Sequence, residues 1–167
     1  MPPATQSEAA VKYRKDEFVL STDRERLDLD LIHGFLTECY WAKGISREIV
    51  ARSMENSLCF GIHARDQQVG FARVISDFAT YAYIADVFVL DAYRGRGLGK
   101  WLMECIMRHP RLQGLRRWSL VTADAHGLYA KSGFTAPRPE IYMERYDEDI
   151  YQRPDPRQPA GISEITK

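Results

Sequence analysis

A strand-like run that ends in a glycine-rich turn constrains this chain most. Residues 87–100 read Val-Phe-Val-Leu-Asp-Ala-Tyr-Arg-Gly-Arg-Gly-Leu-Gly-Lys. The β-branched and apolar start predicts a strand, and the apolar period that follows Gly97 predicts a helix. A helix start presents unpaired backbone N–H groups and the positive end of the helix dipole, and glycines let a ligand approach them. The run therefore predicts a strand, a loop and a helix that together bind an anion, most naturally a phosphate.

The glycine spacing separates this loop from two common phosphate loops. A Walker loop ends in Gly-Lys-Ser/Thr, but here Gly99-Lys100 is followed by Trp101, so no hydroxyl is placed for magnesium. A dinucleotide loop reads Gly-x-Gly-x-x-Gly, and in this chain the last glycine comes one residue early. An enzyme that acts on nucleotide phosphates is therefore disfavoured.

The pattern that fits is Arg-x-x-Gly-x-Gly, formed by Arg94, Gly97 and Gly99. It resembles the pyrophosphate-binding loop of the GNAT superfamily of acyl-CoA-dependent N-acetyltransferases. A second segment, residues 118–134, resembles the other signature of that family: a strand, a short helix with Leu-Tyr-x-Lys, and then Gly-Phe. The order and separation are those of the family, and the resemblance covers roughly residues 17–147.

This resemblance implies a GNAT fold, an α/β (α+β) arrangement in which a mixed central β-sheet is flanked by helices on both faces. The residue patterns predict elements in a matching order, β-α-α-β-β-β-α-β-α-β. The predicted helices begin at caps Asp30 and Ser46 and cover 97–109 and 125–132. The predicted strands are 18–20, a hairpin of 58–64 and 69–76, then 81–90, 115–122, and last Phe134 with 141–146.

The chain length of 167 residues suits one domain. Residues 1–15 and 148–167 are polar or proline-rich and show no hydrophobic period. We therefore expect a flexible tail at each end of a single acetyltransferase domain at 16–147.

The charge balance, the apolar runs and the cysteines limit which partners, compartments and metals we expect. Lys and Arg number 23, as do Asp and Glu, so there is no electrostatic argument for nucleic acid or for an anionic membrane. The chain has no apolar run near the roughly 20 residues that span a bilayer and no signal-peptide core, so a cytoplasmic protein is the default expectation. The three cysteines have no metal-ligand spacing and read as reduced core thiols, so we expect no metal.

The resemblance implies acetyl-CoA as cosubstrate and assigns the residues that bind it. Backbone groups of the loop and of the helix start hold the pyrophosphate. The backbone of Val87–Val89 pairs with the pantetheine arm where this strand diverges from the strand at 120–122. Asp124 would lie beside the cosubstrate, although its position before a helix favours an N-cap instead. The expected binding residues are Val87, Phe88, Val89, Arg94, Gly95, Arg96, Gly97, Leu98, Gly99, Lys100 and Asp124.

Two residues are candidates for proton transfer. Tyr129 occupies the family position of the general acid, where a phenol can donate a proton to the departing thiolate; the alternative is an aromatic ring that packs between helix and sheet. Asp86 is an ionisable residue inside an apolar strand, and burial makes a carboxylate a stronger base. Its alternative is a structural hydrogen bond, while Tyr83 and His63 are weaker candidates for the base.

The resemblance places acceptor selectivity in the two-helix segment and in the last strands. Tyr40 and Trp41 beside the Lys43-Gly44 break could wall an acceptor pocket or could be core aromatics, and Tyr83 adds aromatic surface. No cysteine has a suitably spaced histidine partner for an acyl-enzyme, so we expect direct attack in a ternary complex.

We therefore expect an N-acetyltransferase that moves the acetyl group of acetyl-CoA to a primary amine on a small molecule or a peptide. The alternative is a CoA-binding sensor or interaction module that keeps the cradle and has lost turnover. Dimers are common in the superfamily, so a homodimer is open.

Overall fold

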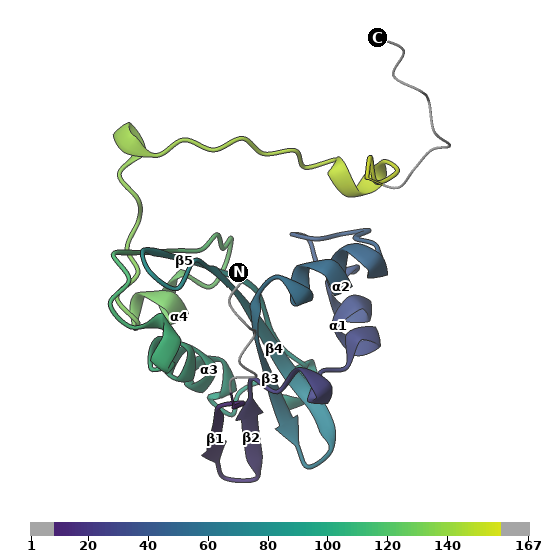
Figure 1. The fold of residues 1–167 in the computed structure, drawn as a ribbon, viewed down its shortest axis with the longest axis vertical. Helices are drawn as coiled ribbons and strands as arrows, with labels where there is room; N and C mark the ends of the chain where they lie inside the picture. Colours follow the sequence, from purple (N-terminus) through teal and green to yellow (C-terminus); the bar gives the residue numbers. More distant parts are fainter. Residues whose placement is uncertain (1–8, 158–167) are drawn as a thin grey trace, which may run out of the picture.

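The structure is a computed structural model, and it describes residues 9–157. One six-stranded sheet runs through it in the order β1-β2-β3-β4-β5-β6 (Figure 1). Its strands are β1 (Lys12–Lys15), β2 (Phe18–Ser21), β3 (Leu58–Ala64), β4 (Gln67–Ser76), β5 (Tyr81–Val89) and β6 (Arg117–Ser119). The α-helices are α1 (Leu29–Leu36), α2 (Arg47–Glu55), α3 (Leu98–Met107) and α4 (His126–Ala130).

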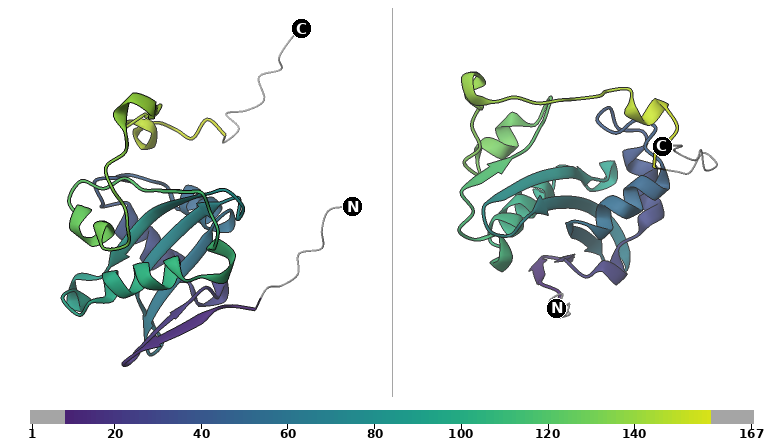
Figure 2. Two further views of the ribbon diagram at one scale, coloured as in Figure 1. Left: turned by 90° about the vertical axis from the view of Figure 1, so that its left-hand side faces the viewer. Right: turned by 45° about the horizontal axis from the view of Figure 1, so that its top comes forward.

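The sheet is mixed, as the sequence predicts. Each strand pairs with its neighbour in the chain; the pairings from β1 to β5 are antiparallel, and β5 and β6 are parallel. The helices α1 and α2 lie on one face of the sheet, and α3 and α4 lie on the other (Figures 1 and 2). The predicted arrangement of helices on both faces is therefore confirmed.

Two apolar clusters hold these layers together. On one face, buried residues of α3, among them Leu102 and Ile106, pack against the sheet. On the other face, Ile32 and Leu36 of α1 pack with Phe88 of β5. Burial of apolar surface at this scale is the main force that fixes the sheet between its helices.

The starts of the first two helices show one correct prediction and one error. Ser46 caps α2, where its Oγ accepts a hydrogen bond from the Ile49 N–H at 3.3 Å. The predicted cap at Asp30 is wrong, because Asp28 caps α1 by accepting from the Leu31 N–H at 3.0 Å. An N-cap lies outside the helix and accepts from an N–H two or three residues further on, whereas Asp30 already lies within α1.

The predicted amino-terminal tail is too long. Residues 12–15 form β1, whose register with β2 pairs Lys12 with Ser21 and Lys15 with Phe18. Three of the four residues of this strand are basic, which hides its pattern in the sequence. Residues 1–8 lie outside the described part of the chain.

The predicted last strands, Phe134 and 141–146, are wrong. Pro139–Ile141 forms a 3-10 turn, and within residues 9–157 the segment after α4 pairs with no strand. Pro137 and Pro139 interrupt this segment, and proline has no N–H to give to a ladder. The segment instead runs from α4 across to the side of α1 and α2 (Figure 1).

Part of the predicted carboxyl-terminal tail is packed. Ile150–Gln152 forms a turn, and Tyr151 contacts the apolar cluster of α1 and α2. The Gln152 side chain donates to the Lys43 carbonyl at 3.3 Å, and Arg52 pairs with Asp155 at 3.6 Å. The remainder of the expected tail, 158–167, lies outside the described residues.

Candidate active site

The strands β5 and β6 separate after the first third of β5. Their pairing is confined to Tyr81–Tyr83 against Arg117–Ser119. On this side of β5, the rest of the strand has no neighbour among residues 9–157. The predicted strand at 115–122 is therefore shorter than expected, and the predicted divergence is confirmed. An opened strand edge presents N–H and C=O groups that can pair with an extended ligand.

A β-bulge shapes the same half of β5. Phe71 of β4 pairs with Phe88, but Arg73 pairs with Ala85, so one extra residue lies on the β5 side. Asp86 stands in that bulge with a φ of 56°. A positive φ is uncommon for a residue with a side chain, and a bulge bends the strand that carries it.

The glycine loop forms the expected cradle in backbone terms. Gly95 and Gly97 have φ values of 76° and 74°, and a Cβ at either position would meet no heavy atom within 4 Å. Gly97 is the N-cap of α3 and provides no side-chain cap. Within the described chain, the N–H groups of residues 95–100 have no acceptor, and the N–H of Trp101 is the first to bond, to the Gly97 carbonyl at 3.0 Å. These open donors fit a diphosphate.

The three basic side chains of the loop all lie at the surface and contact neighbouring groups. Arg94 donates to the Val89 carbonyl at 3.3 Å and so ties the loop to β5. Arg96 pairs with Glu17 at 3.4 Å and lies over the Tyr93 ring. Exposed ion pairs of this kind are worth little, so these charges can turn toward a bound phosphate.

A shallow depression of about 580 Å³ adjoins the loop. Its lining combines the two hairpin turns with the loop itself: Glu17, Ala64, Arg65, Asp66, Gln67, Tyr93 and Arg96. Acidic and basic side chains alternate there, so the depression has no single charge preference.

Tyr129 lies on α4 and is 8% exposed. Burial raises the pKa of Tyr129 to about 12, with smaller contributions from Tyr40 and Asp124. The phenol therefore stays protonated at neutral pH, as a proton donor must. Its ring also meets Phe134 edge-on, with centroids 6.2 Å apart, so the packing role exists as well.

Asp124 does not cap α4, and that prediction is wrong. The N-cap is Ala125, which has no side-chain cap, and its N–H is taken by the Thr122 hydroxyl at 3.0 Å. The Asp124 side chain is exposed, and its charge contributes to the raised pKa of Tyr129. Its role toward the cosubstrate stays a prediction.

Asp86 is almost buried and is ion-paired. Its Oδ2 accepts from the Arg73 Nε at 2.7 Å, and the two side chains are 12% and 14% exposed. Pairing compensates the burial of both charges. The expected structural hydrogen bond is therefore present, and the role of Asp86 as base stays a prediction.

The acceptor candidates approach the site from the connection between α1 and α2. Tyr40 and Trp41 are 61% and 38% exposed, so they are not core residues. The Tyr40 hydroxyl accepts from the Ala123 N–H at 3.2 Å and so bridges to the loop before α4. Tyr83 lies on β5, and burial followed by the Asp86 charge raises the pKa of its phenol.

Sequence reasoning missed Arg73 and Tyr151. A lone cation inside the apolar run of β4 is the same signal that singled out Asp86, so Arg73 could have been found. Nothing in the sequence marks Tyr151, which reaches the site from the predicted tail. Tyr151 packs against the cluster that contains Phe88 of β5. Burial raises the pKa of Tyr151, and the Asp86 charge is the next contribution.

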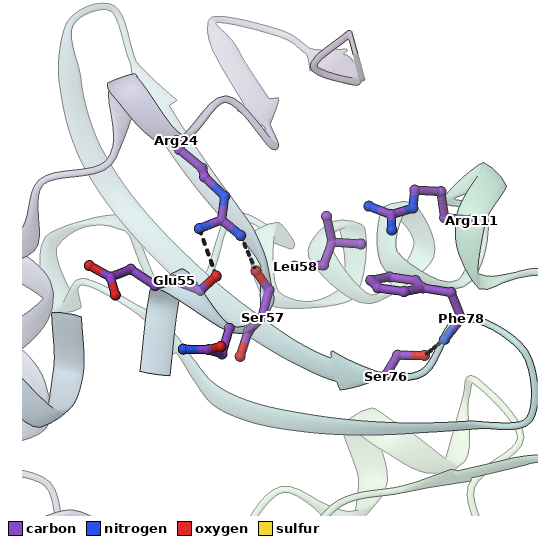
Figure 3. Close-up of a pocket in the computed structure, with 8 residues that line it drawn as sticks. Arg24, Glu55, Ser57, Leu58, Ser76, Phe78 and Arg111 are labelled. Carbon is purple, nitrogen blue, oxygen red and sulfur yellow. Dashed lines mark hydrogen bonds between the residues drawn. The ribbon is translucent and has the colours of Figure 1, made fainter. Parts of the chain in front are cut away.

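A second pocket of about 210 Å³ lies at the start of β3 (Figure 3). Arg24 points into it and donates to three carbonyls, those of Met54, Glu55 and Ser57. On the other side of the pocket, Arg111 lies over the Phe78 ring at 3.7 Å. The Arg24 guanidinium thus caps the carbonyls at the carboxyl-terminal end of α2. We therefore assign this pocket a structural role.

In residues 9–157, no three His, Cys, Asp or Glu side chains gather as metal ligands. Over the same range, no helix is long and apolar enough to cross a membrane. Cys59 and Cys105 are buried and Cys39 is half-buried, and all three thiols are free.

Comparison with known proteins agrees with this geometry. A family model described as the acetyltransferase (GNAT) domain matches residues 55–136. A solved GNAT-family protein from Xanthomonas campestris pv. campestris is 54% identical, with a TM-score of 0.79, over 81% of this chain and 97% of that one. The chain belongs to the GNAT superfamily. The resemblance drawn from the two sequence signatures is confirmed, and so is the fold class.

Two further proteins share less of their sequence with this GNAT protein. A Gibberella zeae protein, FG08082, provisionally named an acetyltransferase, is 27% identical over 143 residues, which cover 72% of this chain and 80% of the relative. A Clostridium acetobutylicum structure, described as an acetyltransferase with acetyl-CoA, has a TM-score of 0.59 at 15% identity, over 83% of this chain and 98% of that one. The second likeness shows the shared fold alone.

Proposed function

We propose that this GNAT protein transfers the acetyl group of acetyl-CoA to a primary amine, by direct attack within a ternary complex. The observation that carries the proposal is the set of open N–H donors at residues 95–100, which lies at the end of the opened strand β5. A diphosphate bound at the loop would direct an attached chain along that strand edge.

The cosubstrate would be held mostly by backbone groups. The amides of the loop and of the first turn of α3 fit the diphosphate, because their donors are open and Gly95 and Gly97 leave space above them. The edge of β5 at Val87–Val89 fits the amides of a pantetheine arm. Acetyl-CoA supplies the activated acetyl group when it is bound.

The proton transfers are assigned to two residues of the chain. Tyr129 is the proposed general acid, because its phenol stays protonated and its ring belongs to the apolar cluster against which Val87 and Val89 of β5 pack. Asp86 is the proposed base, and it acts on the ammonium form of the acceptor, since free alkyl amines are mostly protonated at neutral pH. Arg73 keeps the Asp86 carboxylate in place.

The acceptor is proposed to be a small-molecule or peptide amine that enters between the α1–α2 connection and β5. Tyr40, Trp41 and Tyr83 are the proposed contacts. Tyr40 and Trp41 pack edge-on with centroids 5.1 Å apart, so they offer one continuous aromatic wall. Aromatic walls bind apolar stems and cationic groups alike.

The test is a screen of primary amines in which release of the CoA thiol is followed, together with calorimetric titration of acetyl-CoA. We expect acetyl-CoA to bind and at least one amine to raise thiol release above the rate without acceptor. Tight binding of acetyl-CoA with no turnover across a broad panel would instead support a CoA-binding sensor. Absence of binding would overturn both readings.

A further inference from the structure

The bulge in β5 is held from outside the strand. Asp86 keeps a φ of 56° although it carries a side chain. In the pairing with β4, the same bulge appears as a shift of the strand register between Phe71 and Arg73. A residue persists in such a sparsely populated conformation only where its surroundings determine it.

Arg73 is the group that determines it. Its Nε donates to the Asp86 Oδ2 at 2.7 Å, and its Nη1 donates to the Ser57 Oγ at 3.1 Å. The guanidinium therefore spans from the start of β3 to the bulge in β5. Without it, the Asp86 carboxylate would be buried and unpaired, and it would have to turn toward water and take the backbone with it.

The far end of this link is itself fixed. The Ser57 hydroxyl donates to the Ser53 carbonyl of α2 at 2.7 Å, and the Ser57 carbonyl accepts from Arg24 at 2.8 Å (Figure 3). Ser57 is 7% exposed. Arg73 thus connects a rigid anchor at the end of α2 to the one strained residue of β5.

The bulge lies directly before the part of β5 that would receive the cosubstrate. Asp86 is followed by Val87–Val89, and the Val89 carbonyl is tied to the loop by Arg94 at 3.3 Å. A bulge re-aims the backbone that follows it. Loss of the bulge would turn these backbone groups away from the opening, while the loop at 95–100 would keep its own donors.

We propose that Arg73 is a positioning residue that holds the β5 bulge and so presents the Val87–Val89 backbone to the pantetheine arm of acetyl-CoA. This inference rests on the proposed function, since it assigns the strand edge to that cosubstrate. It separates two parts of one binding site: the loop binds the diphosphate independently of Arg73, and the strand edge depends on it.

The test compares two ligands by calorimetry on the full chain. Acetyl-CoA engages both parts of the site, and adenosine 3′-phosphate 5′-diphosphate engages the loop alone. For Arg73→Met we expect the Kd of acetyl-CoA to rise about tenfold, as it would if the competent strand conformation fell to about a tenth of the molecules. The Kd of the nucleotide fragment should stay within about twofold of the wild-type value.

Glycine provides the decisive second variant. It adopts a positive φ without strain, so Asp86→Gly keeps the bulge without an ion pair. The double variant Arg73→Met/Asp86→Gly should therefore recover acetyl-CoA binding to within about twofold of wild type. A general loss of structure caused by Arg73→Met would weaken binding of the nucleotide fragment as well, whereas the proposed local effect leaves that Kd at the wild-type value.

The matched control is Arg47→Met. Arg47 also pairs through its Nε, with the Asp30 Oδ1 at the same 2.7 Å, but at the surface between α1 and α2. It should change neither Kd. If Arg73→Met does not fold, Ser57→Ala removes the second bond of the guanidinium, together with the bond from the Ser57 hydroxyl to the Ser53 carbonyl. It should weaken acetyl-CoA binding by about threefold and leave the Kd of the nucleotide fragment unchanged.

Two results would overturn the role of Arg73, and a third would overturn the proposed function. Wild-type acetyl-CoA affinity in a folded Arg73→Met variant would overturn the role of Arg73, and so would a double variant as weak as the single one. Failure of the wild-type chain to bind either ligand would instead overturn the proposed function.

Discussion

Phe35 of α1 stacks on Phe88 of β5, with ring centroids 3.9 Å apart and ring planes 11° apart. This contact joins the helix pair to the bulged half of the strand. Phe88 is 4% exposed and also meets Phe71 at 6.0 Å. The aromatic stack therefore supports the strand edge from the face opposite to α3.

Phe35→Ala should lower the free energy of unfolding by about 2–3 kcal/mol, because it removes a partly buried ring and its stacking contact with Phe88. Urea denaturation measures this directly. A double-mutant cycle with Phe88→Ala should give a coupling of about 1 kcal/mol. Additive effects of the two substitutions would contradict a direct stacking contribution.

Gly97→Ala should weaken acetyl-CoA binding at least about tenfold, which is about 1.4 kcal/mol, because the new Cβ would stand in the space above the open amides. Gly114→Ala is the matched control: its φ of 73° and its empty surroundings equal those of Gly97, but it lies outside the loop. Both variants should lose about 1–2 kcal/mol of stability through backbone strain. Equal affinities in the two variants would argue against the cradle.

Tyr129→Phe should lower kcat on the order of 100-fold and leave the Kd of acetyl-CoA nearly unchanged, because only a proton donor is removed. Burial raises the pKa of Tyr129 to about 12. The wild-type pH profile should therefore show no loss of this acid below about pH 11. Steady-state kinetics test the prediction, with Tyr13→Phe as a control, since that tyrosine lies on β1 away from the site. Full activity of Tyr129→Phe would remove it from the acid role.

His63 should make the protein less stable in acid. It is 2% exposed, its Nε2 donates to the Arg26 carbonyl at 2.9 Å, and its Nδ1 is the one buried side-chain polar atom without a partner in residues 9–157. Burial lowers its pKa from the ordinary value of 6.5. Below pH 6.5, His63 therefore binds a proton in the unfolded chain but not in the folded chain. The free energy of unfolding falls as the pH drops from 6.5 toward the lowered pKa, and above pH 6.5 this histidine has no effect on it.

The effect of His63 can amount to at most about 1.4 kcal/mol per pH unit. Urea denaturation of the wild-type chain and of His63→Gln at pH 5.5 and 7.5 measures it, because the difference between the two slopes isolates this residue from the other histidines. Parallel slopes would show that His63 does not contribute.

The order of most elements could be read from local patterns. The hairpin of β3 and β4, the Ser46 cap and the strand–loop–helix run that ends in α3 depend on residues close together in the chain. Hydrophobic period, capping residues and glycine spacing carry that information. Errors arose where a polar strand, β1, concealed its pattern, and where an alternating segment, 141–146, has no partner strand in the described chain.

The sequence by itself determined the anion-binding loop, because unpaired amides at a helix start follow from local backbone geometry. Only the tertiary structure decided that Asp86 forms an ion pair, since its partner Arg73 lies on β4 and the anchor Ser57 lies in the connection between α2 and β3. The same holds for Tyr151, which reaches the site from the far end of the chain. Contacts between residues distant in sequence depend on strand register and on helix packing, and no local pattern specifies these.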